Sequence, residues 1–248
     1  NIAGPGQSQF FGAMENWGAI FTFERILLVD PATTSARAKA QIYGTQAHET
    51  AHQWFGDLVT MAWWDDLWLN EGFASWMATK ATQEFHPEWY PLLTRVGGRE
   101  SAMSLDSYAT THPVVQEIRT VEQTNQAFDT ITYQKGAAVI SMLEAYAGED
   151  VWQRGLQRYM ADNKFSNAKT EDLWAAIEAA GASDLTGIAR DFTTKPGVPL
   201  VTVGAASCAD GATRVALTQS EFSADRKDAA AAAPQGWRIP LLATTLGS

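Results

Sequence analysis

Two histidines and two glutamates have the spacing of a metal-dependent hydrolase. His48 and His52 lie four residues apart in a stretch with helical periodicity, so both imidazoles face one side of the helix and can bind one metal ion. Glu49 projects at an angle to that face, from which a carboxylate can reach a metal-bound water without binding the metal. Glu71 follows His52 after eighteen intervening residues, at the start of a second predicted helix. Three protein ligands leave one tetrahedral position open, which is typical of catalytic zinc.

The link between these two predicted helices, Gly56–Trp68, is rich in aromatic and acidic residues. We expect its three tryptophans to pack in the core: Trp63, Trp64 and Trp68. A histidine ligand commonly donates its second ring nitrogen to a nearby oxygen, often a carboxylate. Three aspartates are candidates for that contact, and the sequence does not choose among them: Asp57, Asp65 and Asp66.

A second motif, GAMEN at Gly12–Asn16, precedes the histidines. With these two long, spaced motifs the chain resembles the catalytic domain of the zinc aminopeptidases of the alanyl aminopeptidase (aminopeptidase N) family, which are gluzincins. The resemblance covers essentially the whole chain. It implies that the protein removes amino-terminal residues from peptides by metal-activated water, with one Zn²⁺ per chain held by His48, His52 and Glu71.

The resemblance also implies roles for single residues. Glu49 would be the general base, and Tyr133 in Ile131–Ala137 would donate a hydrogen bond to the oxyanion of the tetrahedral intermediate. Glu15 would pair with the α-ammonium of the substrate and so distinguish a chain end from the middle of a chain. An extended substrate would bind along the backbone of the GAMEN segment, at Gly12, Ala13 and Met14.

The fold class expected is α+β. Residues 1–197 would form a mainly helical, thermolysin-like catalytic domain with a small amino-terminal β region at Ala19–Val29. Four stretches carry the clearest helical periodicity: Ser35–Phe55, Leu69–Glu84, Phe128–Tyr146 and Asp150–Asp162. The pattern changes at Lys195–Pro199, where two prolines and a glycine end the last helix. Residues 198–248 would begin a β-sandwich with three short strands: Leu200–Val203, Arg214–Thr218 and Trp237–Leu242.

Composition excludes several classes of protein. The 248 residues carry a formal net charge of -10 and lack the Lys/Arg clusters that nucleic acid requires, so nucleic acid is not an expected partner. Cys208 is the single cysteine, which rules out an internal disulfide and a cysteine zinc cluster within the chain. Because no run of about 18 apolar residues occurs, we expect no membrane segment in this chain.

The chain opens directly on a motif and lacks an initiator methionine, so we expect it to be part of a longer protein. Family members carry an amino-terminal β domain and a large helical carboxy-terminal domain that close over the cleft. The expected partners are therefore peptides with a free amino terminus and the missing domains of the same protein. Without those domains we expect weak or no turnover. The alanine-rich composition suggests a bacterial source, with cytoplasm and periplasm both open.

Three other functions stay open at this level. A thermolysin-like zinc endopeptidase also holds its metal with two histidines and one glutamate, and it would cleave substrates with a blocked α-amine equally well. A non-catalytic peptide-binding module would bind well below one metal ion per chain. The epoxide-hydrolysing leukotriene branch of the same superfamily is a further alternative, although no residue of this sequence selects it.

Overall fold

Helices make up most of this structure, a computed structural model that describes residues 1–8, 11–226 and 235–242. The α-helices are α1 (Ala36–Ala51), α2 (Trp68–Phe85), α3 (Pro91–Asp106), α4 (Val121–Ala127), α5 (Gly136–Ala147), α6 (Glu149–Asn163), α7 (Thr170–Ala179) and α8 (Leu185–Thr194). Short 3₁₀ turns are η1 (Glu24–Ile26), η2 (Trp64–Asp66) and η3 (Pro87–Trp89), and η4 (Ile131–Lys135) is a π-helical segment directly before α5. The prediction of a mainly helical chain is confirmed.

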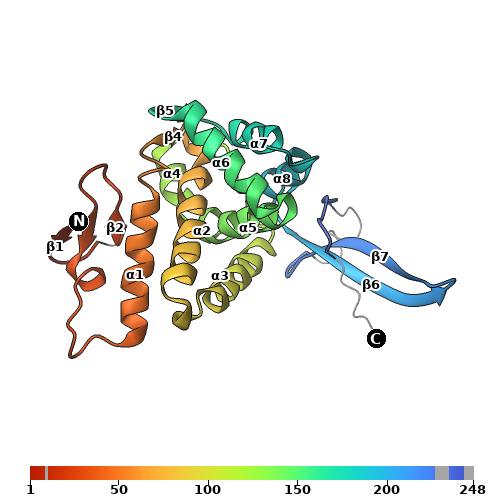
Figure 1. The fold of residues 1–248 in the computed structure, drawn as a ribbon, viewed down its shortest axis with the longest axis horizontal. Helices are drawn as coiled ribbons and strands as arrows, with labels where there is room; N and C mark the ends of the chain where they lie inside the picture. Colours follow the sequence, from red (N-terminus) through yellow and green to blue (C-terminus); the bar gives the residue numbers. More distant parts are fainter. Residues whose placement is uncertain (9–10, 227–234, 243–248) are drawn as a thin grey trace.

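The strands form three small sheets. Strands β1 (Ile2–Gly4), β3 (Phe21–Phe23) and β2 (Ala13–Met14) lie in that order, with β1 parallel and β2 antiparallel to β3. A small amino-terminal β region is thus confirmed, but of the predicted stretch Ala19–Val29 only β3 is a strand, because Glu24–Ile26 forms the 3₁₀ turn η1. The sheet lies beside α1 (Figure 1). Strand β4 (Val59–Met61) pairs in parallel with β5 (Ser166–Ala168), and β6 (Val198–Ala209) pairs with β7 (Ala212–Phe222) as a long antiparallel hairpin.

Helices α1 and α2 lie side by side (Figure 1). Of the predicted ligands, His48 lies in α1, His52 directly follows its last residue, and Glu71 lies in α2. Helix α1 begins at a Ser35 cap, whose hydroxyl accepts a hydrogen bond from the Ala38 N–H at 3.2 Å. In α2 the consecutive residues 68–74 are all buried, so its first two turns are covered on every side. Because these turns are covered on all sides, although they include the polar Asn70 and Glu71, α2 is the central helix of the domain.

Aromatic rings fill the core between α2 and the helices that follow it. The Phe73 ring stacks on Trp152 with centroids 6.5 Å apart, and the Trp68 ring stacks on Trp174 at 5.6 Å. All four side chains are almost fully buried. The expected core position is thus confirmed for Trp68. It is wrong for Trp63 and Trp64, which are 57% and 36% exposed because η2 lies at the surface before α2 enters the core.

Two differences from the predicted helices affect the site. The single helix predicted over Phe128–Tyr146 is divided into η4 and α5, because Asp129 interrupts the helix and binds the amide N–H groups that follow it. Helix α3 was not predicted. Its sequence contains two adjacent glycines, Gly97 and Gly98, which weaken a helical pattern, whereas Pro91 at its first position favours a helix start.

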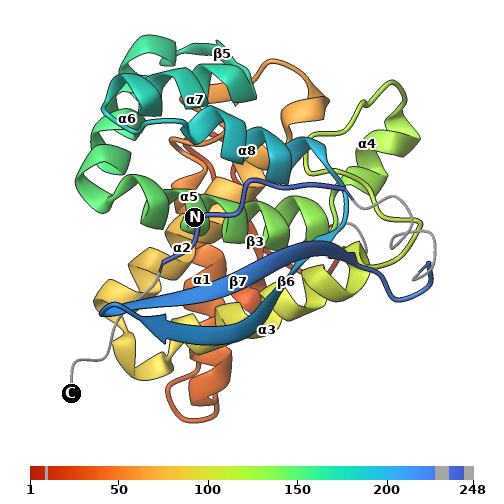
Figure 2. The ribbon, with the colours of Figure 1, turned by 90° about the vertical axis from the view of Figure 1, so that its right-hand side faces the viewer.

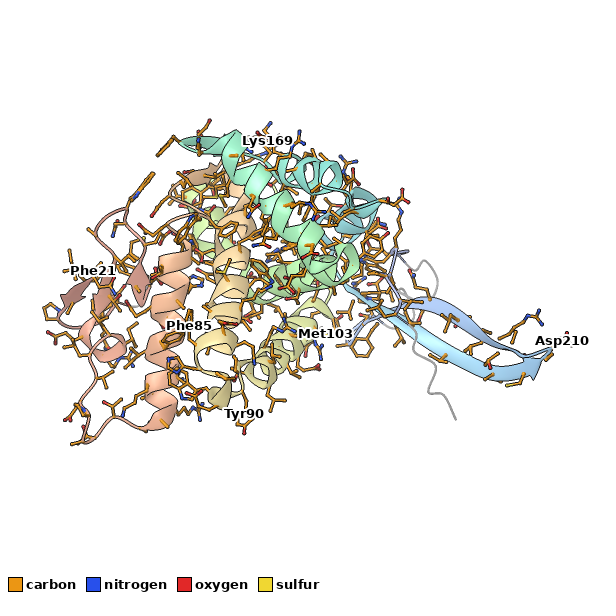
Figure 3. All side chains as sticks on the ribbon, in the orientation of Figure 1. Phe21, Phe85, Tyr90, Met103, Lys169 and Asp210 are labelled. Carbon is orange, nitrogen blue, oxygen red and sulfur yellow. The ribbon has the colours of Figure 1, made fainter. Side chains whose placement is uncertain are left out.

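The carboxy-terminal hairpin projects away from the helical body in Figure 1 and faces the viewer in front of the helices in Figure 2. Its turn is Asp210–Gly211, the residue pair typical of a tight two-residue hairpin, and Asp210 marks the tip in Figure 3. The third predicted strand, Trp237–Leu242, is wrong. The Trp237 backbone instead bonds the side-chain amide of Gln219, at 2.6 Å through its N–H and 2.8 Å through its carbonyl.

The β-sandwich, the thermolysin-like detail and the boundary after residue 197 stay predictions. No helix within the described ranges is both long and apolar enough to cross a bilayer.

Candidate metal centre

Three predicted ligands meet in the structure. His48 Nε2 lies 3.0 Å from His52 Nε2, and Glu71 Oε2 lies 3.2 Å from the first and 3.3 Å from the second. Ligand atoms bound tetrahedrally at about 2.0–2.1 Å from zinc are about 3.3 Å apart. The observed triangle matches that spacing, so the three side chains fit one small divalent metal ion with a fourth position left free.

The donor chemistry of His52 supports the same conclusion. Its Nδ1 lies 2.9 Å from the Phe55 carbonyl oxygen, which can only accept, so Nδ1 carries a proton and Nε2 is left for a second proton or a metal ion. Nε2 faces the Glu71 carboxylate, which also accepts only. A proton or a metal cation must therefore lie between Nε2 and Glu71. The backbone contact turns His52 Nε2 toward Glu71, the orientation that a metal ligand would need.

The protonation states show how strongly this pair attracts positive charge. Burial alone would lower the pKa of His52, but the hydrogen bond and charge of Glu71 raise it to about 9. Burial alone would raise the pKa of Glu71, yet hydrogen bonds from His48 and His52 lower it to about 2. A carboxylate that stays ionised while buried is stabilised by a cation, which is the environment a metal ligand requires.

The contacts of the predicted aspartates differ from the expectation. Within the described residues, Asp57 accepts a hydrogen bond from the Gln53 amide, Asp65 from the Ile118 N–H, and Asp66 from the Thr170 hydroxyl. The His52 ring binds a backbone carbonyl instead, and the Ser75 hydroxyl lies 3.5 Å from His48 Nδ1. Ser75 is four residues after Glu71, so its place on the same face of α2 could have been found from helical spacing.

A close approach of two helices sets the distance between Glu71 and Tyr133. A Cβ atom at Gly72 would lie 3.3 Å from the Gly136 Cα and 3.4 Å from the Thr132 carbonyl oxygen. The backbone of α2 therefore passes almost directly against the junction of η4 and α5. A Cβ at Gly72 would crowd this contact, whereas a Cβ at Gly136 would lie at an ordinary 3.4 Å from the Gly72 Cα, so the missing side chain at Gly72 in particular lets Glu71 and Tyr133 lie in one cleft.

Tyr133 is half-buried on η4 and faces the ligand cluster. Its ring lies nearly parallel to the His48 ring, at 20° with centroids 6.0 Å apart, and its hydroxyl is close enough to Glu71 for that carboxylate to act on its pKa. Burial and the negative charges of Glu71, Glu15 and Glu49 raise the pKa of Tyr133 well above its ordinary value. The phenol therefore keeps its proton and can act as a hydrogen-bond donor.

Glu49 points into the same cleft and is 6% exposed. Burial, together with the charges of Glu15 and Glu71, raises its pKa to about 7. Asp57 is affected similarly, since burial and the charge of Glu15 raise its pKa to about 6. The carboxylates thus form a cluster of negative charge that a bound cation would stabilise.

The GAMEN segment forms one wall of the cleft. Strand β2 is the edge strand of its sheet, and Gly12, Ala13, Met14 and Glu15 all line the cleft. The Gln53 side-chain amide of the segment after α1 donates to the Glu15 carbonyl at 2.9 Å, which connects the GAMEN segment to the end of α1. The Glu15 side chain is half-exposed and lines this cleft, whose volume is about 1520 Å³.

Comparison with known proteins agrees with this site. The model of the peptidase family M1 domain matches residues 5–192. A leucyl aminopeptidase of Saccharolobus solfataricus is 43% identical over 217 residues, which are 86% of this chain and 26% of that protein. A probable aminopeptidase 1 of Sulfurisphaera tokodaii is 46% identical over 193 residues (77% and 24%), and aminopeptidase M1 of Arabidopsis thaliana is 41% identical over 211 (85% and 23%).

The chain spans about a quarter of the length of these curated relatives. The matched residues include every predicted site residue, from Gly12 to Tyr133. The alignment therefore covers the ligand triangle, the buried glutamate beside it and the edge strand that lines the cleft, and this chain belongs to peptidase family M1.

Proposed function

We propose that this chain provides the catalytic site of a zinc-dependent aminopeptidase. The observation that carries the proposal is the ligand triangle, in which two histidine nitrogens and one carboxylate oxygen lie 3.0, 3.2 and 3.3 Å apart. Nitrogen and oxygen donors in a three-ligand set are typical of catalytic zinc. The names of the relatives support the peptidase assignment.

When bound, a zinc ion would polarise the scissile carbonyl and lower the pKa of water. Glu49 is suited to take the proton of that water and return it to the leaving amine, because its buried carboxylate lines the cleft next to the ligand cluster. Tyr133 keeps its proton, and its ring lies beside the His48 ring of the ligand cluster. It would stabilise the developing oxyanion, a role in which one donor contributes about 3–4 kcal/mol.

The selection of a free amino terminus is proposed to come from Glu15. An α-ammonium group placed beside β2 would enter the cluster formed by Glu15, Glu49 and Asp57, whose mutual repulsion it would relieve. The free edge of β2 would hold the substrate backbone extended. A substrate without that positive charge would leave the carboxylates unpaired, so the same groups that bind an amino terminus disfavour the middle of a chain.

The test compares zinc-loaded protein on aminoacyl anilides with a free and with an acetylated α-amine. We expect hydrolysis of the free amine only. Glu15→Gln should lower kcat/KM for the free amine by about 10- to 100-fold, as expected for loss of one charged hydrogen bond. Glu49→Gln should lower kcat by about 10²- to 10⁴-fold with metal content unchanged. Glu84→Gln, an exposed glutamate on α2, is the matched control. Equal cleavage of both substrates would show an endopeptidase instead.

We further infer that the 248-residue chain alone turns over slowly. Met14 and Trp64, which line the cleft, are 37% and 36% exposed, so bulk water reaches the site. Water weakens the charge interactions on which this chemistry depends. Rates should be compared between this chain and the longest natural polypeptide that contains it. A rate in the chain equal to that of the longer protein would contradict the inference.

A further inference from the structure

The π-helical segment η4 carries Tyr133 and needs support from outside itself. The Gly136 N–H reaches back five residues to the Ile131 carbonyl, the hydrogen bond that defines a π-helix. Such segments are rare and short, because α-helical geometry is favoured, and they occur frequently at functional sites. The direction of the Tyr133 hydroxyl therefore depends on the contacts that hold η4 in this conformation.

Asp129 holds the first turn of η4. Its Oδ1 accepts hydrogen bonds from the Ile131 N–H at 3.0 Å and the Thr132 N–H at 3.1 Å. Its backbone carbonyl accepts the Tyr133 N–H at 3.1 Å. Three consecutive amides of η4 thus depend on one residue. A rotation of the Asp129 side chain would release two of them, so the carboxylate must itself be fixed.

His112 fixes that carboxylate. Its Nε2 lies 2.8 Å from Asp129 Oδ2, and its Nδ1 lies 2.8 Å from the Pro113 carbonyl oxygen. Both partners only accept, so both ring nitrogens donate and the ring is an imidazolium. The loop that carries His112 is itself held to the core, because Val114 is 2% exposed and the Val115 N–H donates to the Thr193 carbonyl at 2.8 Å.

The other charges around His112 agree with a positive ring. Asp106 acts on it as a second negative charge, although that carboxylate is paired with Lys135 at 2.6 Å on the far end of η4. Burial would lower the pKa of His112, but the hydrogen bond to Asp129 and the contact with the Pro113 carbonyl raise it overall. Two ion pairs thus hold η4, with His112 and Asp129 at its start and Lys135 and Asp106 at its end.

We propose that His112 is a positioning residue that, through Asp129, fixes η4 and directs the Tyr133 hydroxyl toward the ligand cluster. The effect on catalysis rests on the proposed peptidase function. The effect on η4 does not, so the two can be tested apart. His112 itself lies outside the cleft lining and touches Tyr133 only through Asp129.

The first test measures amide hydrogen exchange of His112→Ala, His112→Gln and wild type, without reference to activity. Exchange over residues 131–135 should rise about tenfold or more in His112→Ala and stay near wild type in His112→Gln, whose amide can still donate to Asp129. His86→Ala is the matched control, since His86 also pairs with a carboxylate, Glu88, but has no link to η4. Unchanged exchange at 131–135 in His112→Ala would overturn the proposal even if the protein proved not to be a peptidase.

The second test is a double-mutant cycle in the longest natural polypeptide that contains this chain. His112→Ala should lower kcat by about 10- to 100-fold, with KM within about twofold and zinc content unchanged. In a Tyr133→Phe background the same change should have less than about a twofold effect, because the hydroxyl that His112 directs is gone. Equal losses in both backgrounds would mean a general structural role and refute the proposal. A loss of kcat in His112→Gln as large as that in His112→Ala would also refute the proposal.

If wild type hydrolyses no aminoacyl anilide while exchange at 131–135 responds to His112→Ala as expected, the proposed function fails and the positioning of η4 stands.

Discussion

Replacing Gly72 by alanine tests the close contact on which the site geometry depends. The added Cβ would lie 3.3 Å from two backbone atoms of Gly136 and 3.4 Å from the Thr132 carbonyl oxygen. These are backbone atoms of a packed helix junction, so they cannot rotate away as the end of a side chain would. The new methyl group must push α2 away from η4 and α5.

Two opposing terms set the expected change in stability. Alanine in a helix interior is more favourable than glycine by about 1 kcal/mol. Overpacking a well-packed contact costs about 1–3 kcal/mol. The net effect of Gly72→Ala is therefore a destabilisation of about 0–2 kcal/mol. Gly97→Ala is the matched control, because Gly97 lies within α3, is exposed and has no neighbouring atom within 4 Å of the place that a Cβ would take. Gly97→Ala should raise the free energy of unfolding by about 1 kcal/mol.

The assay is equilibrium unfolding in urea, followed by tryptophan fluorescence, with excess chelator so that metal binding does not contribute. The two variants should differ by about 1–3 kcal/mol in the free energy of unfolding. For a chain of this size that difference corresponds to at least about 2 °C in melting temperature. If Gly72→Ala stabilises as much as Gly97→Ala, the backbone contact between α2 and α5 is absent and the argument for the placement of Tyr133 fails.

Three further predictions concern the core, the metal and a titrating side chain. Phe73→Ala should destabilise the chain by about 3–5 kcal/mol in the same urea assay, because the ring is fully buried between Phe55, Trp68 and Trp152. A loss of unfolding free energy under about 1 kcal/mol would contradict that packing. Zinc at a thousand times its dissociation constant should raise the free energy of unfolding by about 4 kcal/mol, and Glu71→Ala should abolish most of that gain in calorimetric scans. The pKa of His112 is raised in the folded state, so its contribution to stability should be complete below the unfolded pKa of about 6.5 and should disappear as pH rises through the folded pKa. The measurement is the difference in unfolding free energy between wild type and His112→Ala as a function of pH. A difference that grows as pH rises would contradict the prediction.

The sequence predicts that His48, His52 and Glu71 lie together, and the structure confirms this for a physical reason. His48 and His52 are on one face because the helix between them is regular, and the following link is short enough to return Glu71 to the same end of α1. The same reasoning fails for their partners. The Phe55 carbonyl that orients His52 is a backbone group, which every residue possesses, so no residue type marks it.

The irregular elements were also beyond the sequence. The stretch around Tyr133 has ordinary helical periodicity, and the π-helical hydrogen bond appears only because Asp129 and the neighbouring Gly72 backbone constrain it. Trp237–Leu242 has the composition of a strand, but the Gln219 side chain takes up the backbone groups of Trp237 that a neighbouring strand would need. In both places a contact distant in sequence overrides the local preference.

The grouping of His48, Glu49, His52 and Glu71 was determined by the sequence itself, since residue type and linear spacing suffice to predict that these side chains lie together. Tertiary structure alone decided how these helices meet. The contact between Gly72 and Gly136 brings Tyr133 to the ligands, and the burial of Glu49 moves its pKa to about 7. Helical spacing depends on local geometry, whereas backbone distance and desolvation depend on the packing of residues that are far apart in the chain.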